Sequence, residues 1–325
     1  MKAKDWRPAA PLEHLRQRAD VLGRIRQFFH ERGVLEVETP LLSRHASTEP
    51  HLDSLTTRYT GPGFAGGVTL HLQTSPEYAM KRLLAAGSGP IYQICKAFRD
   101  GEAGPRHNPE FTLLEWYRPG CDHHALMNEV ALLVATLLSS GAECRRMTYA
   151  EAFGVYAGCD PHRAPLSELY QCLREATGGE LQGIDTDDRD TLLDLLMSHA
   201  VEPRLDAGPV FIHDFPASQA ALARVRPGDP PLAERFELYI DGVEVANGYH
   251  EVTDPGEQAA CFRRDRERRR QLQRPDVLPD GRLLAAMEAG MPPCAGVALG
   301  IDRLLMVKAR AKGIDEVVAF PVGIA

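Results

Sequence analysis

The sequence lacks the segments that direct a chain into or across a membrane. Its first residues, MKAKDWRPAAPLEHL, contain no apolar stretch of the kind found in signal peptides. No run of about eighteen apolar residues occurs anywhere in the chain, so a membrane-spanning helix is not expected. We therefore expect a cytoplasmic protein that does not contact membranes.

Paired cysteines and the common nucleotide-binding motifs are also absent. The 7 cysteines include no C-x-x-C pair, which indicates reduced thiols rather than a disulfide or zinc framework. The CDHH stretch at Cys121–His124 has no second pair of ligands to match it, so we interpret it as a turn in which Asp122 caps a helix. Neither G-x-x-x-x-G-K-[ST] nor a G-x-G-x-x-G after a strand occurs, which excludes a P-loop and a Rossmann site.

Positive charge is in deficit. Lysine and arginine number 37 against 45 aspartates and glutamates, a net charge of −8, which is the wrong sign for a protein that binds nucleic-acid backbone over a broad surface. The 325 residues, 44% of them apolar, suffice for a sizeable core in one large domain or two ordinary ones.

The first third of the chain alternates helix and strand signals. Apolar residues at steps of three and four from Leu12 to Phe29 predict an amphipathic helix with Gly33 as its C-cap. The runs VLEVETP and VTLHLQT are typical of strands, and SPEYAMKRLL predicts a helix with Ser75 as N-cap and Pro76 in its first turn.

Two hairpins are predicted further along. The turn-rich loop FRDGEAGPRHNPEF, from Phe98 to Phe111, lies between the apolar runs PIYQICKAF and TLLEWY. In RFELYIDGVEVANGYHEV, Asp241 and Gly242 form a two-residue hairpin turn between alternating apolar runs. The segment from about 122 to 209 is mostly helical, and GVALGIDRLLMVKARA is a strand that runs into a helix. The fold class is therefore α+β, with a mostly antiparallel sheet.

Arginines and carboxylates recur on these predicted hairpins and on the last helix. They are Arg99, Arg106 and Arg303, with Glu237, Glu244 and Glu251. Opposing guanidinium and carboxylate groups on neighbouring strands suit a polyphosphate held through a divalent metal.

Three segments carry a family resemblance. FFHERGVLEVETP, FRDGEAGPRHNPEFTLLEWY and GVALGIDRLLM resemble motifs one, two and three of class II aminoacyl-tRNA synthetases, most closely the lysyl-tRNA synthetase catalytic domain. The resemblance implies one catalytic domain over residues 1–325, with the mainly helical segment of about 122–209 between motifs two and three. Lysyl enzymes carry an anticodon-binding OB-fold ahead of motif one, where this chain has only roughly twenty residues, so no binding of a tRNA anticodon is expected.

The shortened relatives that the chain resembles are the elongation factor P lysine ligases. Lysyl-tRNA synthetases usually read Ala-Pro-Glu where this chain has Ser75-Pro76-Glu77, and glycine where it has Ala298. The resemblance implies a homodimeric ligase that uses ATP and Mg²⁺ to adenylate (R)-β-lysine and transfers it to the ε-amine of a lysine of elongation factor P. The alternatives are a truncated lysyl-tRNA synthetase-like enzyme, a free amino-acid ligase acting on a small amine, and an inactive regulatory paralogue.

The resemblance also assigns roles residue by residue. The ATP contacts are Arg99, Asp100, Gly101, Arg106, His107, Asn108, Phe111, Glu244, Val245, Gly300 and Arg303, of which Arg99, Glu244 and Arg303 are catalytic. The Mg²⁺ ligands are Glu237 and Glu244. The amino-acid pocket comprises Ser75, Pro76, Glu77, Glu115, Tyr117, Asn247, Tyr249, Glu251 and Ala298, whereas Trp116 is interpreted as ordinary packing.

Motif two departs from the family at one position. Gly101 stands where the family has the glutamate that helps to read adenine. Either Glu102 takes over that contact through a shifted loop, or adenine is read by the backbone alone.

Overall fold

The computed structural model describes residues 6–325 apart from 140, 142, 180–185 and 207. The described residues form two compact units, each assembled from segments that are distant in the sequence. The first unit comprises the chain up to Gly120, Thr253–Cys294 and Ala298–Ala325, and the second comprises Cys121–Val252 and Ala295–Val297. The single domain over 1–325 remains a prediction.

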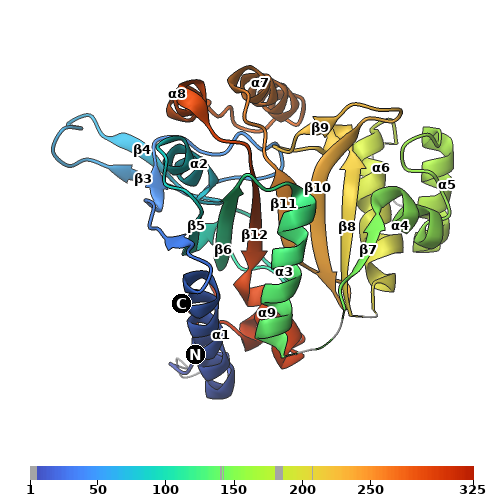
Figure 1. Cartoon of the computed structure of the whole chain (residues 1–325), viewed down its shortest axis with the longest axis horizontal. Helices are drawn as coiled ribbons and strands as arrows, with labels where there is room; N and C mark the ends of the chain where they lie inside the picture. The colour runs from blue at the N-terminus through green and yellow to red at the C-terminus, as the bar shows by residue number, and fades with distance from the viewer. Residues whose placement is uncertain (1–5, 140, 142, 180–185, 207) are drawn as a thin grey trace, which may run out of the picture. The chain divides into compact units, whose positions relative to one another are not determined.

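The first unit holds two small sheets and several helices (Figure 1). Its elements are α1 (Leu12–His30), β1 (Leu35–Glu36), β2 (Leu42–Ser43), β3 (Thr56–Tyr59), β4 (Val68–Leu72), α2 (Glu77–Ala85), β5 (Ile91–Phe98), β6 (Glu110–Pro119), α7 (Pro255–Gln271), α8 (Gly281–Gly290) and α9 (Ile301–Ala309). Strand β5 pairs with β1 in parallel and with β6 in antiparallel, and β4 pairs with both β2 and β3 in antiparallel. Strand β12 (Cys294–Gly300) contributes residues to both units.

Helix α1 packs through its apolar stripe against the first unit. Ile25 and Phe29 are fully buried, and the Phe29 ring stacks on Tyr92 at 4.4 Å and meets the edge of Trp116 at 5.3 Å. Trp116 is therefore a packing residue, as predicted. The helix ends at His30 with Glu31 as its C-cap, so the predicted cap at Gly33 is wrong, although Gly33 does make the left-handed turn that follows, with φ of +63°.

The second unit is built on a sheet covered by helices of the middle segment. Its elements are α3 (His123–Leu138), β7 (Arg145–Thr148), α4 (Tyr149–Tyr156), α5 (Leu166–Thr177), α6 (Arg189–Leu196), β8 (Pro209–Pro216), β9 (Val225–Arg226), β10 (Leu232–Ile240) and β11 (Val243–His250). Strand β10 pairs in antiparallel with β8, β9 and β11, and β7 joins β8 in parallel. Apolar side chains of α4, α5 and α6 pack with those of β8 and β10 in one core, so the helical segment serves to cover this sheet.

Most of the predicted elements are present. The α+β class with mostly antiparallel strands is confirmed, as are both hairpins, and Asp241 and Gly242 have the positive φ values, +51° and +71°, of their predicted turn. The helix predicted to be capped by Ser75 begins at Glu77 with Pro76 as its N-cap, although the Ser75 hydroxyl still accepts a hydrogen bond from the Glu77 N–H at 3.1 Å. Strands β2, β3, β7 and β9 and helix α8 were not predicted.

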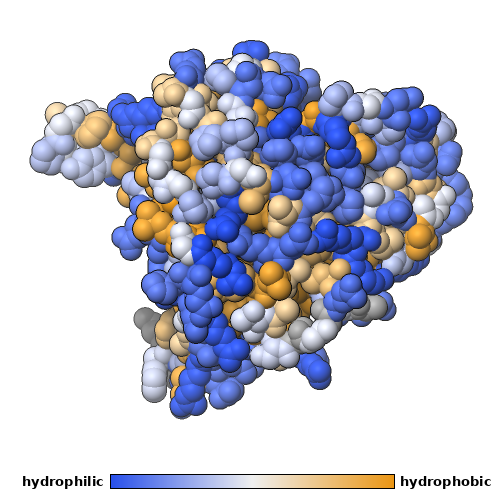
Figure 2. Space-filling model, in the orientation of Figure 1, coloured by the Kyte–Doolittle hydropathy of each residue, from blue (hydrophilic) through white to orange (hydrophobic). Residues whose placement is uncertain are grey.

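The surface of the drawn face is mostly hydrophilic, with apolar residues in small groups (Figure 2). Among the residues that the structure describes, no helix combines the length and apolar character needed to cross a membrane.

Candidate active site

The motif two loop lies between β5 and β6 and is fixed at both ends. The strands pair from Ile91 with Tyr117 to Phe98 with Glu110. Beyond the last pair, the Arg99 N–H donates to the Pro109 carbonyl at 2.9 Å. Gly101 has φ of +80°, a conformation that glycine adopts without strain, and a Cβ there would meet nothing within 4 Å. The glycine at this departure from the family pattern therefore serves the backbone turn.

Two arginines of the predicted ATP site have defined neighbours in the first unit. The Arg99 guanidinium lies 5.0 Å from the centre of the Phe111 ring and 3.5 Å from Glu102. The Arg303 guanidinium lies 2.7 Å from Nε2 of His107. Motif two and motif three thus meet at the contact between Arg303 and His107. Glu102, which is the candidate residue for reading adenine, pairs with Arg99.

Asn108 has a structural contact that the sequence did not predict. Its side chain is buried, donates to the Glu110 carbonyl at 2.7 Å and accepts from the Val322 N–H at 3.0 Å. Asp100 and Arg106 are exposed on the same loop. Asn108 therefore ties the C-terminal segment to the loop, while its role as an ATP contact remains a prediction.

Asp302 connects motif three to motif two and was not predicted from the sequence. The carboxylate is buried, accepts from the Thr112 N–H at 2.6 Å and receives the Arg18 guanidinium on its other oxygen. Arg18 also donates to the Val317 carbonyl at 2.8 Å. The signal was a carboxylate directly before Arg303 in GIDRLLM, at the start of a helix that begins after Gly300. Its partners were not predictable because Thr112 is 190 residues away.

Glu115, a carboxylate of the predicted amino-acid pocket, is held through both of its oxygens. It is buried on β6, and both of its oxygens accept hydrogen bonds of 2.7 Å, one from the Ser75 hydroxyl and one from the Tyr117 hydroxyl. Burial, reinforced by the Glu115 charge, raises the pKa of the neighbouring Cys95 thiol to about 12. A buried carboxylate held by hydrogen bonds in this way is suited to receive a desolvated ammonium group.

Glu77, beside Pro76 at the start of α2, has a partner inside the protein. Its carboxylate lies 2.6 Å from Nζ of Lys81, whose side chain is fully buried, at the i,i+4 spacing that brings two helical residues together. The buried Lys81 ammonium already neutralises the Glu77 carboxylate, so less negative charge remains at Glu77 for a substrate. Lys81 was missed because an isolated lysine in a helical segment normally faces solvent. Ala298 lies half-buried on β12.

The carboxylates predicted to bind Mg²⁺ lie in the second unit. Glu237 is on β10 opposite Asn247, and Glu244 is on β11 opposite Tyr239, with a bulge between Leu238 and Tyr239. Burial raises the pKa of the Glu237 carboxyl; Arg235 opposes this rise, and the negative charge of Glu244 adds to it. Two interacting carboxylates with oxygen ligands only are a donor set that suits Mg²⁺, whose charge would relieve their repulsion.

Arg235 organises this part of the second unit and was also missed. Its guanidinium donates to Glu237, to the Gln219 carbonyl at 2.8 Å and to the side chain of Asn247 at 3.3 Å, and it lies 5.9 Å from the Tyr249 ring. Its spacing of two from Glu237 in RFELYI places both on one face of the strand, which is the signal that sequence reasoning could have used.

The same hairpin carries Tyr239, which was not predicted, and the predicted residues Val245 and Glu251 lie on or beside it. The Tyr239 hydroxyl donates to the second oxygen of Glu237 at 2.6 Å. Val245 on β11 and Glu251 just beyond it are buried. The structure therefore brings Glu237, Asn247 and Tyr249 together around Arg235 within this unit.

Comparison with known proteins finds similarity over nearly the whole length of the chain. Residues 2–323 match the model of the family described as tRNA synthetases class II (D, K and N). The chain is 51% identical over 322 residues to the elongation factor P–(R)-β-lysine ligase of Vibrio cholerae, covering 99% of both chains. It is 51% identical over 323 residues to the protein of that name in Pseudoalteromonas translucida, again covering 99% of both, and 48% identical over 318 residues to that of Sodalis glossinidius, covering 98% of this chain and 97% of the relative. The motif resemblance and the class II fold expectation are thereby confirmed: the chain belongs to the class II tRNA synthetases of the D, K and N group.

Proposed function

We propose that the protein is an ATP-dependent ligase that adenylates (R)-β-lysine and transfers it to a lysine side chain of elongation factor P. The observation that carries this proposal is the 51% identity, over 99% of both chains, with a relative that bears this activity in its name. With an elongation factor as acceptor, we propose that the reaction takes place in the cytoplasm. We further propose that the enzyme is a homodimer formed through motif one.

The buried carboxylate of Glu115 in the first unit supports a diamine substrate. A diamine brings two ammonium groups, and burying either one without a carboxylate would cost several kcal/mol. Glu115 is fixed by Ser75 and Tyr117 through hydrogen bonds to both oxygens, so it needs little reorganisation to receive a cation.

In the first step, a carboxylate oxygen of β-lysine attacks the α-phosphorus of ATP, and pyrophosphate leaves. Arg99 is assigned to the α-phosphate, and Arg106, His107 and Arg303 to the outer phosphates, where they stabilise the charge that develops. Glu237 and Glu244 would hold Mg²⁺, which supplies further charge neutralisation for the triphosphate.

In the second step, the neutral ε-amine of the acceptor lysine attacks the carbonyl carbon of the adenylate. The C–N bond forms, the acyl–phosphate bond breaks, AMP leaves, and the amine loses a proton. No nucleophile of the enzyme is required, because positioning of the two reactants and stabilisation of charge can supply the acceleration.

The intact mass of elongation factor P provides the test. The purified protein is incubated with ATP, Mg²⁺ and (R)-β-lysine, with and without elongation factor P, and with Arg303→Ala as the matched inactive control. We expect a mass increase of one β-lysyl residue on the acceptor, with AMP release that depends on it. AMP release with an unmodified acceptor would instead indicate a ligase that uses a small amine. Acylation of tRNA in a parallel reaction would indicate a truncated synthetase.

A further inference from the structure

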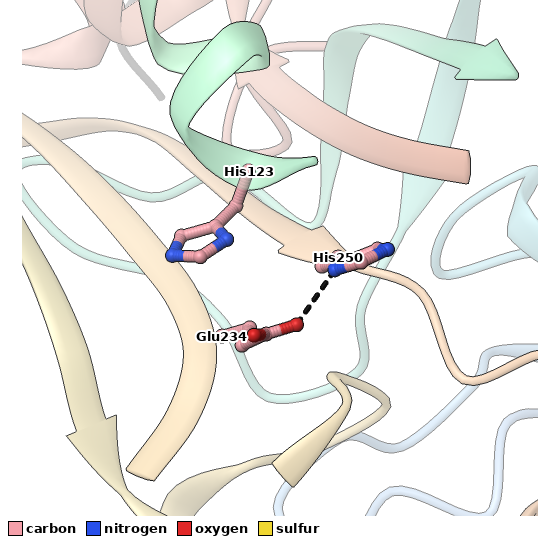
Figure 3. A group of neighbouring side chains, drawn as sticks. All are labelled: His123, Glu234 and His250. Carbon is pink, nitrogen blue, oxygen red and sulfur yellow. Dashed lines mark hydrogen bonds and ion pairs between the residues drawn. The ribbon is translucent and has the colours of Figure 1, made fainter. Parts of the chain in front are cut away.

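A cluster of histidines and a carboxylate in the second unit takes no part in the site described above. His123 is the first residue of α3, Glu234 lies on β10, and His250 is the last residue of β11. Each offers one ligand atom, and these atoms all lie within 4.8 Å of one another. Figure 3 shows the three side chains converging from the helix and the two strands.

The cluster occupies the face of the hairpin opposite to Arg235. Strands β10 and β11 pair Arg235 with Tyr249 and Phe236 with Gly248. Side chains alternate between the two faces of a strand, so Glu234 and His250 point away from the face that carries Arg235 and Tyr249. The cluster is therefore separate from the residues assigned to ATP, Mg²⁺ and the amino acid.

His123 supplies an independent indication of a ligand. The side chain is 2% exposed, and neither ring nitrogen has a hydrogen-bond partner. A buried polar group without a partner costs free energy, and native proteins rarely retain one without a function or a bound species. Its Nε2 is 3.8 Å from Oδ1 of Asp214, which leaves Nδ1 to face the other two members of the cluster.

The contacts of the other two members are compatible with a bound cation. Nδ1 of His250 is 2.6 Å from Oε2 of Glu234, a geometry in which the imidazole proton can be exchanged for a metal ion. Arg226 approaches Glu234 at 3.8 Å, and Arg224 approaches Nε2 of His250 at 3.5 Å. Both arginines reach the cluster from the surface and can turn toward solvent.

We propose that His123, Glu234 and His250 bind a zinc ion. Two imidazoles and one carboxylate are a ligand set typical of Zn²⁺, with a water molecule completing four-coordination. Asp214 lies behind His123 and would orient its ring as carboxylates do at metal-bound histidines. Binding displaces the proton between His250 and Glu234, which leaves to solvent.

The ion would have a structural role. It would join the first turn of α3 to two adjacent strands, β10 and β11, whose other face carries Arg235 and Glu237. The CDHH stretch, which lacked a second ligand pair in the sequence, receives that pair from Glu234 and His250. Asp122 keeps its predicted capping role, because its side chain accepts from the Ala125 N–H at 2.8 Å.

Zinc titration of the full-length protein without a histidine tag tests the proposal. The protein is treated with a chelator, and Zn²⁺ is then titrated by calorimetry in excess Mg²⁺, with bound metal counted by mass spectrometry. We expect one zinc ion per chain and a higher Tm when it is bound. Glu234→Gln and His250→Gln should each weaken binding by about 100-fold or more, and Asp214→Asn by about 10- to 100-fold.

The control is His199→Gln, an exposed histidine of the π-helix Met197–Val201 that is not part of the cluster, and it should bind zinc as the parent does. Far-UV circular dichroism of the zinc-free variants verifies that they are folded, and the nearly isosteric Glu234→Gln serves if a histidine variant does not fold. A parent protein that takes up no zinc at micromolar concentrations would overturn the proposal. Unchanged affinity in Glu234→Gln would do the same.

Discussion

Asp302 accepts a hydrogen bond of 2.6 Å from the backbone N–H of Thr112. This bond joins α9, the helix that carries Arg303, to β6, the strand that carries Phe111 and Thr112. The other oxygen of Asp302 holds the Arg18 guanidinium, which reaches it from α1. One buried carboxylate therefore links motif two and motif three to α1, the helix whose last residues belong to motif one.

Replacing Asp302 should damage both stability and adenylation. Asp302→Ala leaves the mostly buried Arg18 guanidinium without its carboxylate, and breaking such a pair typically costs about 3–5 kcal/mol of unfolding free energy. Asp302→Asn retains an acceptor but not the charge and should cost less. Because Asp302 positions Arg303 indirectly, we also expect kcat/KM for ATP to fall by about 10- to 100-fold in Asp302→Ala.

Urea unfolding and pyrophosphate exchange measure the two effects. Arg18→Ala combined with Asp302→Ala should cost much less than the sum of the single changes, because both remove the same interaction. Additive losses, or a normal kcat/KM in Asp302→Ala, would show that this network does not position motif three.

Arg303→Ala and Glu244→Ala should each abolish adenylate formation while leaving the fold intact. Each variant removes a charge assigned to the triphosphate or its metal, an effect of roughly 3 kcal/mol, or about 100-fold in rate, or more. Pyrophosphate exchange measures adenylation and thermal unfolding measures the fold. Arg282→Ala and Glu288→Ala, both exposed on α8, are controls of the same chemical types. Exchange at the parent rate would remove the residue concerned from the mechanism.

The sequence predicted elements that depend on neighbouring residues better than contacts between distant ones. The turn at Asp241 and Gly242 and the break before Phe111 are encoded in a few adjacent residues, and both hairpins were predicted correctly. Strand β7 was missed because RRMT has no apolar alternation and is held in place by its pairing with β8.

The candidate site shows the same division. The motif positions could be identified from local patterns, whereas the partners that fix them could not. Tyr117 donates to Glu115 from two positions away, but Ser75 reaches the same carboxylate across 40 residues of sequence. The pairing of Lys81 with Glu77 required knowledge that this face of α2 is buried, because the same i,i+4 pair on an exposed helix would be unremarkable.

We expect the protein to be a dimer joined through the segment of motif one. Leu35 and Leu42 are 55% and 44% exposed in this region, and large apolar side chains in such positions mark interaction surfaces when they cluster. Light scattering should give a mass twice the 35.8 kDa of one chain. Leu35→Glu with Leu42→Glu should yield monomers, whereas Leu132→Glu, on the exposed face of α3, should not. A monomeric parent at micromolar concentration contradicts this expectation.

Asp265 should make the protein less stable as the pH rises from about 4 to 6. Burial raises the pKa of its carboxyl from 3.8 to about 6, although the Thr48 hydroxyl donates to it at 2.7 Å. The folded protein retains a proton that the unfolded chain has lost in this range, so the stability present below pH 3.8 is lost as the pH passes 6.

Asp265→Asn should remove this dependence, because its side-chain oxygen can still accept from Thr48. Relative to the parent, the variant should gain unfolding free energy between pH 4.5 and 7.5. The full pKa shift of Asp265 corresponds to about 3 kcal/mol of unfolding free energy. We expect a gain of roughly 1–2 kcal/mol, because the carboxyl is only partly buried. Urea unfolding at the two pH values measures the gain, with the exposed Asp206→Asn as control. If the difference in unfolding free energy between the variant and the parent were the same at both pH values, Asp265 would not titrate in this range.

Ala298 should contribute to the choice between lysine isomers. It stands where lysyl-tRNA synthetases have glycine, and one added methyl group in a tight pocket is worth about 1–3 kcal/mol of discrimination. The α-ammonium of ordinary lysine should be the crowded group, whereas a β-ammonium should be received beside Ser75. The hydroxyl of Ser75 already donates to Glu115, so its remaining lone pair and the Glu115 carboxylate are the acceptors, rather than the Glu77 carboxylate that Lys81 neutralises.

We therefore expect the parent enzyme to activate (R)-β-lysine with a higher kcat/KM than L-α-lysine, and Ala298→Gly to narrow that ratio by about 10-fold. Pyrophosphate exchange with each isomer measures the ratio. Ser75→Ala, which removes the hydroxyl but adds no space near position 298, should lower kcat/KM for (R)-β-lysine, because Glu115 loses one of its two hydroxyl donors. If Ala298→Gly left the ratio unchanged while Ser75→Ala altered it, the hydrogen bonding around Glu115 rather than the methyl group at 298 would determine the preference.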